Sequence, residues 1–151
     1  MHSQKLSTFD QALSLLSHRE HGTKELVNKL KLKGHTGKDI TSAIEQLQNI
    51  NYLNDERFAE IFVRSRISKP LGANRILQEL IQKGINSTLA KEAINNAEVD
   101  WFELAKTLKA RKFGEEVTTD FKEKGRQSRY LQYRGFSFDE IKYAISSEDE
   151  Y

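Results

Sequence analysis

The sequence contains no cysteine, one proline and one tryptophan among its 151 residues. Without cysteine the chain has no disulfide framework, no thiolate nucleophile and no cysteine-based zinc site. No apolar run approaches the ~18–20 residues that a membrane-spanning helix needs. The opening segment MHSQKLSTFDQALSLL has one lysine and no small-residue cleavage site, and it continues directly into a helical pattern. We therefore expect no signal peptide, no membrane contact and a cytoplasmic location.

Neither sign of charge dominates, because 24 Lys and Arg face 22 Asp and Glu and leave a formal net charge of +2. Hydrophobic residues make up 37% of the chain, below the ~45–50% (Gly included) of typical globular chains. Eight Phe, five Tyr and many Leu and Ile still give more regular hydrophobicity than a disordered chain has. These proportions favour a thin fold with much surface and a small core.

A threefold internal repeat is the main feature of the sequence. Lys33-Gly34, Lys83-Gly84 and Arg134-Gly135 recur at intervals of 50 and 51 residues. Each glycine has a leucine four residues before it, a small polar residue two residues after it, and an Ala-Ile pair nine and ten residues after it. These positions are Leu30, Leu80 and Leu131, then Thr36, Asn86 and Ser137, then Ala43-Ile44, Ala93-Ile94 and Ala144-Ile145. Agreement at four offsets indicates an internal triplication.

Each repeat is predicted to contain three helices. A glycine after an apolar-periodic segment can adopt the left-handed conformation that ends a helix, and the polar residue two positions later can cap the next one. An amphipathic stripe precedes each such helix pair, at Phe9, Ala12, Leu13 and Leu16, at Phe58, Ile61 and Phe62, and at Trp101, Leu104, Ala105 and Leu108. The residues predicted to form the core are Leu30, Phe58, Phe62, Leu80 and Trp101.

The predicted fold is all-α, with three tandem three-helix repeats over 9–53, 55–99 and 100–147 and flexible ends at 1–8 and 148–151. A unit of ~50 residues buries little apolar surface alone, so neighbouring repeats should stack into an elongated, curved arrangement. The third repeat departs from the pattern over 112–125, KFGEEVTTDFKEKG, where we expect a longer or bent loop.

Residues suited to catalysis or metal binding are sparse. His18 and His21 are three apart, but they lie at a helix end beside Gly22, where histidine commonly serves the helix dipole. The sequence has no HExxH, no glycine-rich phosphate loop and no nucleophile elbow. Its acids alternate with Lys and Arg as they do on solvated helix faces. We therefore predict no catalytic residue, no metal and no cofactor, and the chain is not expected to be an enzyme.

Basic residues concentrate in the second and third repeats. Residues 64–75 hold four of them without an acid, and residues 104–134 hold nine against four acids. Phe113, Tyr130 and Tyr133 lie among them, a combination that suits a polyanion or an acidic protein face. For any single residue, an ordinary solvated helix face is an equally good interpretation.

The helix, glycine turn and capped helix also resemble a helix-turn-helix, whose last helix would enter the major groove of DNA. The candidate helices are 38–50, 88–97 and 138–146. Their outward residues are mostly acidic or neutral: Glu45, Gln46, Glu92, Asn95, Asp139 and Glu140. Such side chains suit a groove lined with phosphates poorly, so sequence-specific DNA reading is disfavoured.

Four segments resemble the RecX regulatory proteins of bacteria: ALSLLSHREHGTKELVNKLKLKG, NYLNDERFAEIFVRSRISKPLGANRILQELIQKGI, RKFGE and RYLQYRGFSFDEI. The second segment is the most specific, with Tyr52-Leu53-Asn54-Asp55, Arg57-Phe58-Ala59, Gly72, Arg75-Ile76, Glu79-Leu80 and Lys83-Gly84-Ile85. The resemblance spans about residues 9–147. It implies three tandem three-helix repeats and transfers no catalytic residue.

The same resemblance implies a regulator that binds the RecA recombinase and its filament on single-stranded DNA. Such a protein would lie in the filament groove and inhibit filament extension, ATP hydrolysis, strand exchange and repressor cleavage, in DNA repair, homologous recombination and the SOS response. We expect a monomer. The predicted contact residues are Arg64, Arg66, Lys69, Arg75, Lys109, Arg111, Lys112, Arg126, Arg129 and Arg134. Two alternatives stay open, a helical nucleic-acid-binding protein that acts directly on DNA and a generic protein-interaction scaffold.

Overall fold

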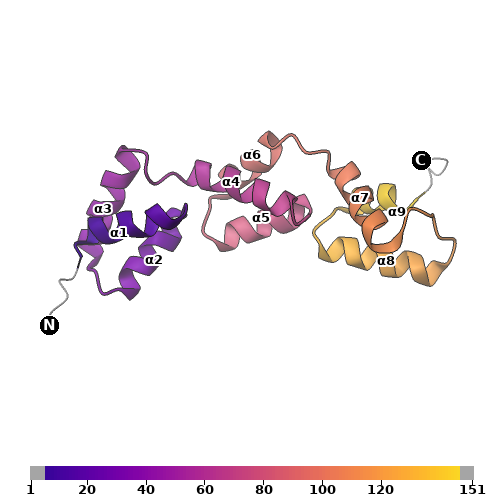
Figure 1. Ribbon diagram of the computed structural model, residues 1–151, viewed down its shortest axis with the longest axis horizontal. Helices are drawn as coiled ribbons and strands as arrows, with labels where there is room; N and C mark the ends of the chain where they lie inside the picture. Colours follow the sequence, from indigo (N-terminus) through magenta and orange to yellow (C-terminus); the bar gives the residue numbers. More distant parts are fainter. Residues whose placement is uncertain (1–5, 147–151) are drawn as a thin grey trace. The chain divides into compact units, whose positions relative to one another are not determined.

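The computed structural model describes residues 6–146 and contains nine α-helices and no strand within that range (Figure 1). The helices are α1 (Thr8–His18), α2 (Thr23–Leu32), α3 (Gly37–Asn49), α4 (Asp55–Ile67), α5 (Ala73–Gln82), α6 (Ser87–Asn96), α7 (Trp101–Phe113), α8 (Phe121–Tyr133) and α9 (Phe138–Ile145). They form three successive sets of three, which confirms the predicted all-α fold of three tandem three-helix repeats. No helix in this range combines the length and the apolar character needed to cross a bilayer.

The chain divides into two compact units. The first comprises residues 6–59 with Leu80–Ala90, and the second comprises Glu60–Glu79 with residues 91–146. The repeat bounds 9–53, 55–99 and 100–147 stay a sequence prediction. Of the ends predicted to be flexible, residues 1–5 and 148–151 lie outside the described residues, whereas Thr8 is buried and begins α1.

The three glycines of the repeat end α2, α5 and α8 in the left-handed conformation. Gly34, Gly84 and Gly135 have φ angles of +88°, +86° and +97°. The amide after each glycine donates to the carbonyl oxygen of the leucine five residues back. The distances are 3.2 Å from His35 to Leu30, 3.0 Å from Ile85 to Leu80 and 3.1 Å from Phe136 to Leu131. This closure of the last turn is the Schellman arrangement, and all three leucines are fully buried.

The small polar residue after each glycine turn caps the helix that follows. Thr36 Oγ1 accepts from the amide of Asp39 at 3.3 Å, and Asn86 Oδ1 takes the same role at the start of α6. Ser137 Oγ accepts from the amide of Glu140 at 3.2 Å, while Glu140 Oε1 accepts from the amide of Ser137 at 2.8 Å. Ser137 and Glu140 therefore form a capping box, and all three predicted capping residues cap the following helix.

Burial agrees with the predicted core except at one aromatic residue. Four of the five predicted core residues are buried: Leu30, Phe58, Phe62 and Leu80. Trp101 is only half-buried, so its assignment to the core is wrong. It is the first residue of α7, directly after the N-cap Asp100, and the buried stripe of that helix begins one turn later at Ala105.

The connection between α7 and α8 is longer than those between α1 and α2 and between α4 and α5, as predicted, but it is shorter than the segment 112–125. Only residues 114–120 separate the two helices, so the predicted break over 112–125 is wrong at both ends. Lys109 of α7 is 2% exposed, and its Nζ donates to the carbonyl oxygens of Gly114 and Glu116 at 2.8 Å each. Burial lowers the pKa of Lys109. This side chain therefore holds the start of the loop against the end of α7, and Asp120 caps the start of α8.

A glycine at the start of a second helix meets the glycine turn of the following repeat in both compact units. A Cβ on Gly22 would lie 3.2 Å from Cδ1 of Ile85. In the second unit the amide of Gly72 donates to the carbonyl oxygen of Arg134 at 2.7 Å, and a Cβ on Gly72 would clash with the backbone of Gly135. The repeated glycine therefore permits close approach of two backbones.

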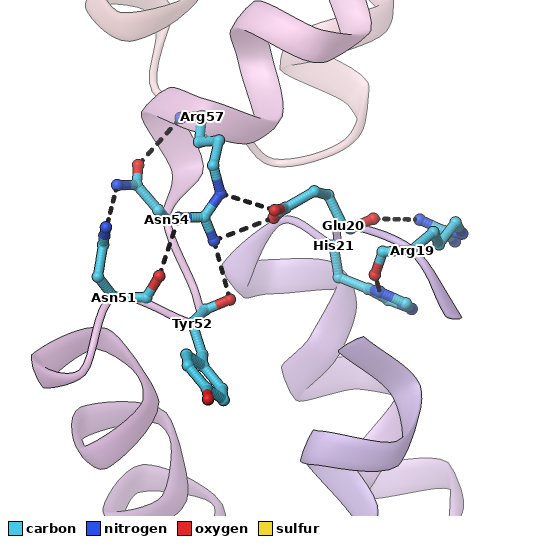
Figure 2. Close-up of polar contacts among 7 residues, drawn as sticks. All are labelled: Arg19, Glu20, His21, Asn51, Tyr52, Asn54 and Arg57. Atoms are coloured by element: carbon cyan, nitrogen blue, oxygen red, sulfur yellow. Dashed lines mark hydrogen bonds and ion pairs between the residues drawn. The ribbon is translucent and has the colours of Figure 1, made fainter. Parts of the chain in front are cut away.

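Arg57 of α4 holds the segment that leads from the first repeat into the second (Figure 2). Its guanidinium donates to the carboxylate of Glu20 at 2.6 and 3.3 Å and to the carbonyl oxygens of Asn51 and Tyr52 at 2.8 and 3.0 Å. The Oδ1 of Asn54 accepts from the Arg57 amide at 2.9 Å. The segment around these residues, which carries the most specific family resemblance, therefore forms a structural joint.

His21 is buried beside this joint, in the connection between α1 and α2 (Figure 2). Its Nδ1 lies 3.0 Å from the carbonyl oxygen of Arg19, and its Nε2 lies 3.0 Å from Nζ of Lys29. The carbonyl requires a proton on Nδ1, so Nε2 accepts from the lysine and the neutral ring satisfies both partners. Burial is the main reason that the pKa of His21 is lowered.

Replacing Gly72 with Ala should destabilise the protein by about 1–3 kcal/mol, because the added methyl group meets backbone that cannot rotate away. Gly37→Ala is the matched control, since a Cβ there meets nothing within 4 Å and the residue opens α3. The control should change stability by less than about 1 kcal/mol. Urea unfolding followed by circular dichroism measures both variants, and equal midpoints would refute the close contact.

The stability supplied by neutral His21 should depend on pH. Because its folded pKa lies below the unfolded value of about 6.5, this stability is complete above that pH and is lost as the pH falls through the folded pKa. His21→Leu, which introduces the residue type found at Leu71 in the second repeat, should lose less stability between about pH 7.5 and pH 5.5. Unfolding free energies of both proteins at the two pH values test this, and parallel losses would contradict it.

Candidate partner-binding site

Four of the ten predicted contact residues present unpaired charges at the surface. They are Arg64, Lys69, Arg111 and Arg129. Their side chains are exposed, and within residues 6–146 none of them forms an ion pair or a side-chain hydrogen bond. Arg64 and Glu60 of α4 also line a small pocket together with Ala93 and Asn96 of α6. These four cations can meet an external anion without giving up an internal partner.

Arg66 and Arg75 are instead engaged with the same carboxylate. Arg66 Nε donates to Oε1 of Glu79 at 3.2 Å, and its guanidinium lies 4.3 Å from the ring centre of Phe62. Arg75 Nε lies 3.7 Å from Oε2 of Glu79, and its Nη1 donates to the carbonyl oxygen of Tyr133 at 3.1 Å. Both arginines are only partly exposed, and both stabilise the second compact unit.

Three further predicted contact residues surround a pair of aromatic rings. Phe113 and Tyr130 pack edge to face with centroids 5.4 Å apart. The guanidinium of Arg126 lies 5.0 Å from the Phe113 ring centre, and Lys112 Nζ and the Arg134 guanidinium lie 5.5 and 5.4 Å from that of Tyr130. The structure therefore brings together the basic and aromatic residues that interleave in the sequence, and cation–π attraction orients the charges.

Lys109 does not belong to the contact surface. Its buried ammonium is already shared between the carbonyl oxygens of Gly114 and Glu116, so its assignment as a filament contact is corrected. The sequence could not show this, because a lysine within a basic run looks like its exposed neighbours.

Arg126 is exposed, but it forms a two-bond pair with Glu123 that lowers the pKa of that carboxyl.

The second compact unit also contains a groove that sequence reasoning missed. It has a volume of about 690 Å³ and lies among α5, α8 and α9. Phe136 and Ile141 are buried beneath it, while Tyr133 and Phe138 are 74% and 80% exposed at its side. Comparison of the three repeats could have indicated the groove, because the large Phe138 stands where the other two copies have a small residue.

Family comparisons agree with this architecture. Models of the first, second and third three-helix domains of RecX match residues 9–47, 54–94 and 98–145. The regulatory protein RecX of Vibrio parahaemolyticus is 46% identical over 96% of this chain and 94% of its own. That of Halorhodospira halophila is 41% identical over 93% of this chain and 88% of its own.

A solved structure shows the same fold. The crystal structure of RecX from Lactobacillus salivarius matches with a TM-score of 0.81 and 25% identity, covering 95% of this chain and 96% of that one. Sequence and fold thus agree over nearly all of each compared chain, and the protein belongs to the RecX family.

Proposed function

We propose that this chain binds the RecA recombinase and its filament on single-stranded DNA. It lies in the filament groove and inhibits filament extension, ATP hydrolysis, strand exchange and repressor cleavage. The observation that carries the proposal is the 46% identity, over 96% of the chain, to a protein named regulatory protein RecX. RecA itself follows from the family resemblance of the sequence segments. The proposal places the protein in the cytoplasm as a monomer, with a role in DNA repair and the SOS response.

The arrangement of charges supports a polyanionic or acidic partner. Four exposed cations without internal partners are distributed over α4, its C-terminal end, α7 and α8. Exposed charges act mainly by accelerating encounter and fixing orientation, and each contributes modestly to affinity. Contact with a long filament can sum many such contributions. The proposed contact set is therefore Arg64, Lys69, Arg111 and Arg129, supplemented by the cations around Phe113 and Tyr130.

Reversing the charge of an unpaired cation should weaken inhibition without disturbing the fold. Arg64→Glu and Arg129→Glu should each raise the concentration needed to inhibit the DNA-dependent ATPase of RecA by about two- to fivefold. Lys38→Glu is the matched control, because Lys38 is exposed in the first compact unit and outside the proposed set. Equal inhibition by all three variants would contradict the assignment. Reversal of Arg66 and Arg75 would be less informative, since it would leave Glu79 without its partners.

Binding to DNA without RecA is the competing function. The cations around Phe113 and Tyr130 favour it, because aromatic and basic side chains together bind single strands. A salt titration separates the two functions. A regulator of the recombinase should bind RecA-coated strands far more tightly than bare strands at every salt concentration. A direct DNA binder should bind bare strands strongly, with an affinity that falls steeply with salt. Fluorescence anisotropy of a labelled oligonucleotide with and without RecA measures both.

A further inference from the structure

The groove among α5, α8 and α9 has two aromatic residues, Tyr133 and Phe138, at its rim. Tyr133 and Phe138 line the groove while remaining 74% and 80% exposed. Exposed aromatic side chains beside a hollow are typical of interaction sites, because they contribute a large apolar area with little conformational freedom to lose. These two residues therefore leave substantial apolar surface in water.

The internal repeat shows that neither aromatic residue is needed to build the turn. Counted from the glycine of each repeat, the position of Phe138 holds Gly37 in the first copy and Ser87 in the second. The position of Tyr133 holds Leu32 and Gln82. All three copies form the same glycine turn and the same following helix. The turn therefore does not require aromatic residues at these two positions, although the Tyr133 ring also lies 5.2 Å from the Arg75 guanidinium.

The groove combines an apolar floor with positive charge. Phe136 and Ile141 beneath it are 2% and 7% exposed. Arg75 and Lys142 are the charged residues that line it, and no carboxylate is among its lining residues in the described part of the chain. Arg75 is held in place by the carbonyl oxygen of Tyr133 and is paired with Glu79 at 3.7 Å, whereas Lys142 is exposed and forms no ion pair within residues 6–146. A ligand here would bury an apolar group next to two cations.

We infer that this groove receives a segment of the partner protein in which an apolar side chain is flanked by carboxylates. The inference rests on the proposed function, in which that partner is RecA. The apolar side chain would pack on Phe136 and Ile141 between the rings of Tyr133 and Phe138, and the carboxylates would face Arg75 and Lys142. Buried aromatic anchors inside a charged rim are the usual source of affinity between proteins.

A nucleic-acid strand fits the groove less well than a protein segment does. Channels for single strands follow the backbone with a row of cations, and every phosphate needs a counter-charge. Only Arg75 and Lys142 are available here, and the remaining wall is formed by amide and aliphatic side chains such as Gln78 and Ile145. Direct contact with DNA is therefore an outcome that the experiment must separate from the protein contact.

Substitutions taken from the other repeats test the groove in the full chain. Phe138→Ser and Tyr133→Gln introduce the residue types of the second repeat, and Lys142→Thr introduces that of the first. Each aromatic substitution should weaken binding to RecA filaments on single-stranded DNA by about tenfold, and Lys142→Thr by about two- to fivefold. Phe121→Ser is the matched control, because Phe121 is 88% exposed in the same unit but does not line the groove. The affinity of Phe121→Ser should equal that of the unmodified chain, and so should the melting temperatures of all four variants.

Photo-crosslinking then identifies what occupies the groove. Phe138 is replaced by p-benzoylphenylalanine, and the full chain is irradiated on assembled filaments, with the same replacement at Phe121 as control. A crosslink from position 138 to a RecA peptide that contains an apolar residue and carboxylates supports the inference. Crosslinking to DNA, or wild-type affinity of Phe138→Ser, overturns it while the proposed function stands. If the unmodified chain does not bind filaments at all, the proposed function fails and this inference fails with it.

Discussion

The close contact of two backbones at Gly72 and Gly135 is the constraint on which the second compact unit depends. The amide of Gly72 donates to the carbonyl oxygen beside Gly135, and there is no room for a Cβ on Gly72. Gly135 also has a positive φ that ends α8. Gly135 therefore both ends α8 and leaves room for the segment at the start of α5. Gly22 and Ile85 show a looser version of the same contact in the first unit, where a side chain rather than backbone is the neighbour.

The third repeat replaces this contact with polar side chains. The position of Gly22 and Gly72 holds Glu123, which pairs with Arg126 and accepts from Nε2 of Gln127. Gln127 itself is buried where the other copies have Leu26 and Ile76, and its Oε1 has no hydrogen-bond partner in the described structure. In the third repeat a charged side chain, Glu123, therefore lies at the position where Gly22 and Gly72 contact the glycine turn of another repeat. Repeat proteins commonly differentiate copies in this way, since a copy whose face is polar can end a stack.

Charge in this protein has two separate uses that composition cannot distinguish. Some basic residues serve the fold: Arg57 closes the joint between repeats, Lys109 holds a loop, and Arg66 and Arg75 share Glu79. Others are exposed and unpaired, so their charge is available to a partner. This division explains why a modest net charge of +2 is compatible with a locally basic surface. All of the proposed contacts lie in the second compact unit, which also contains the aromatic groove.

The sequence by itself determined the helical repeat, because a glycine at a helix end, a leucine before it and a capping residue after it act through local geometry. Glycine turns, caps and most of the core followed from these local patterns, whereas the family followed from the resemblance of four longer segments. The tertiary structure alone decided which charges are free, since Lys109 and Arg129 look alike within a basic run. It also decided the half-burial of Trp101, the length of the loop before α8 and the groove beside Phe138. These depend on which residues distant in the chain pack together, and the spacing of neighbours along one helix carries no record of that.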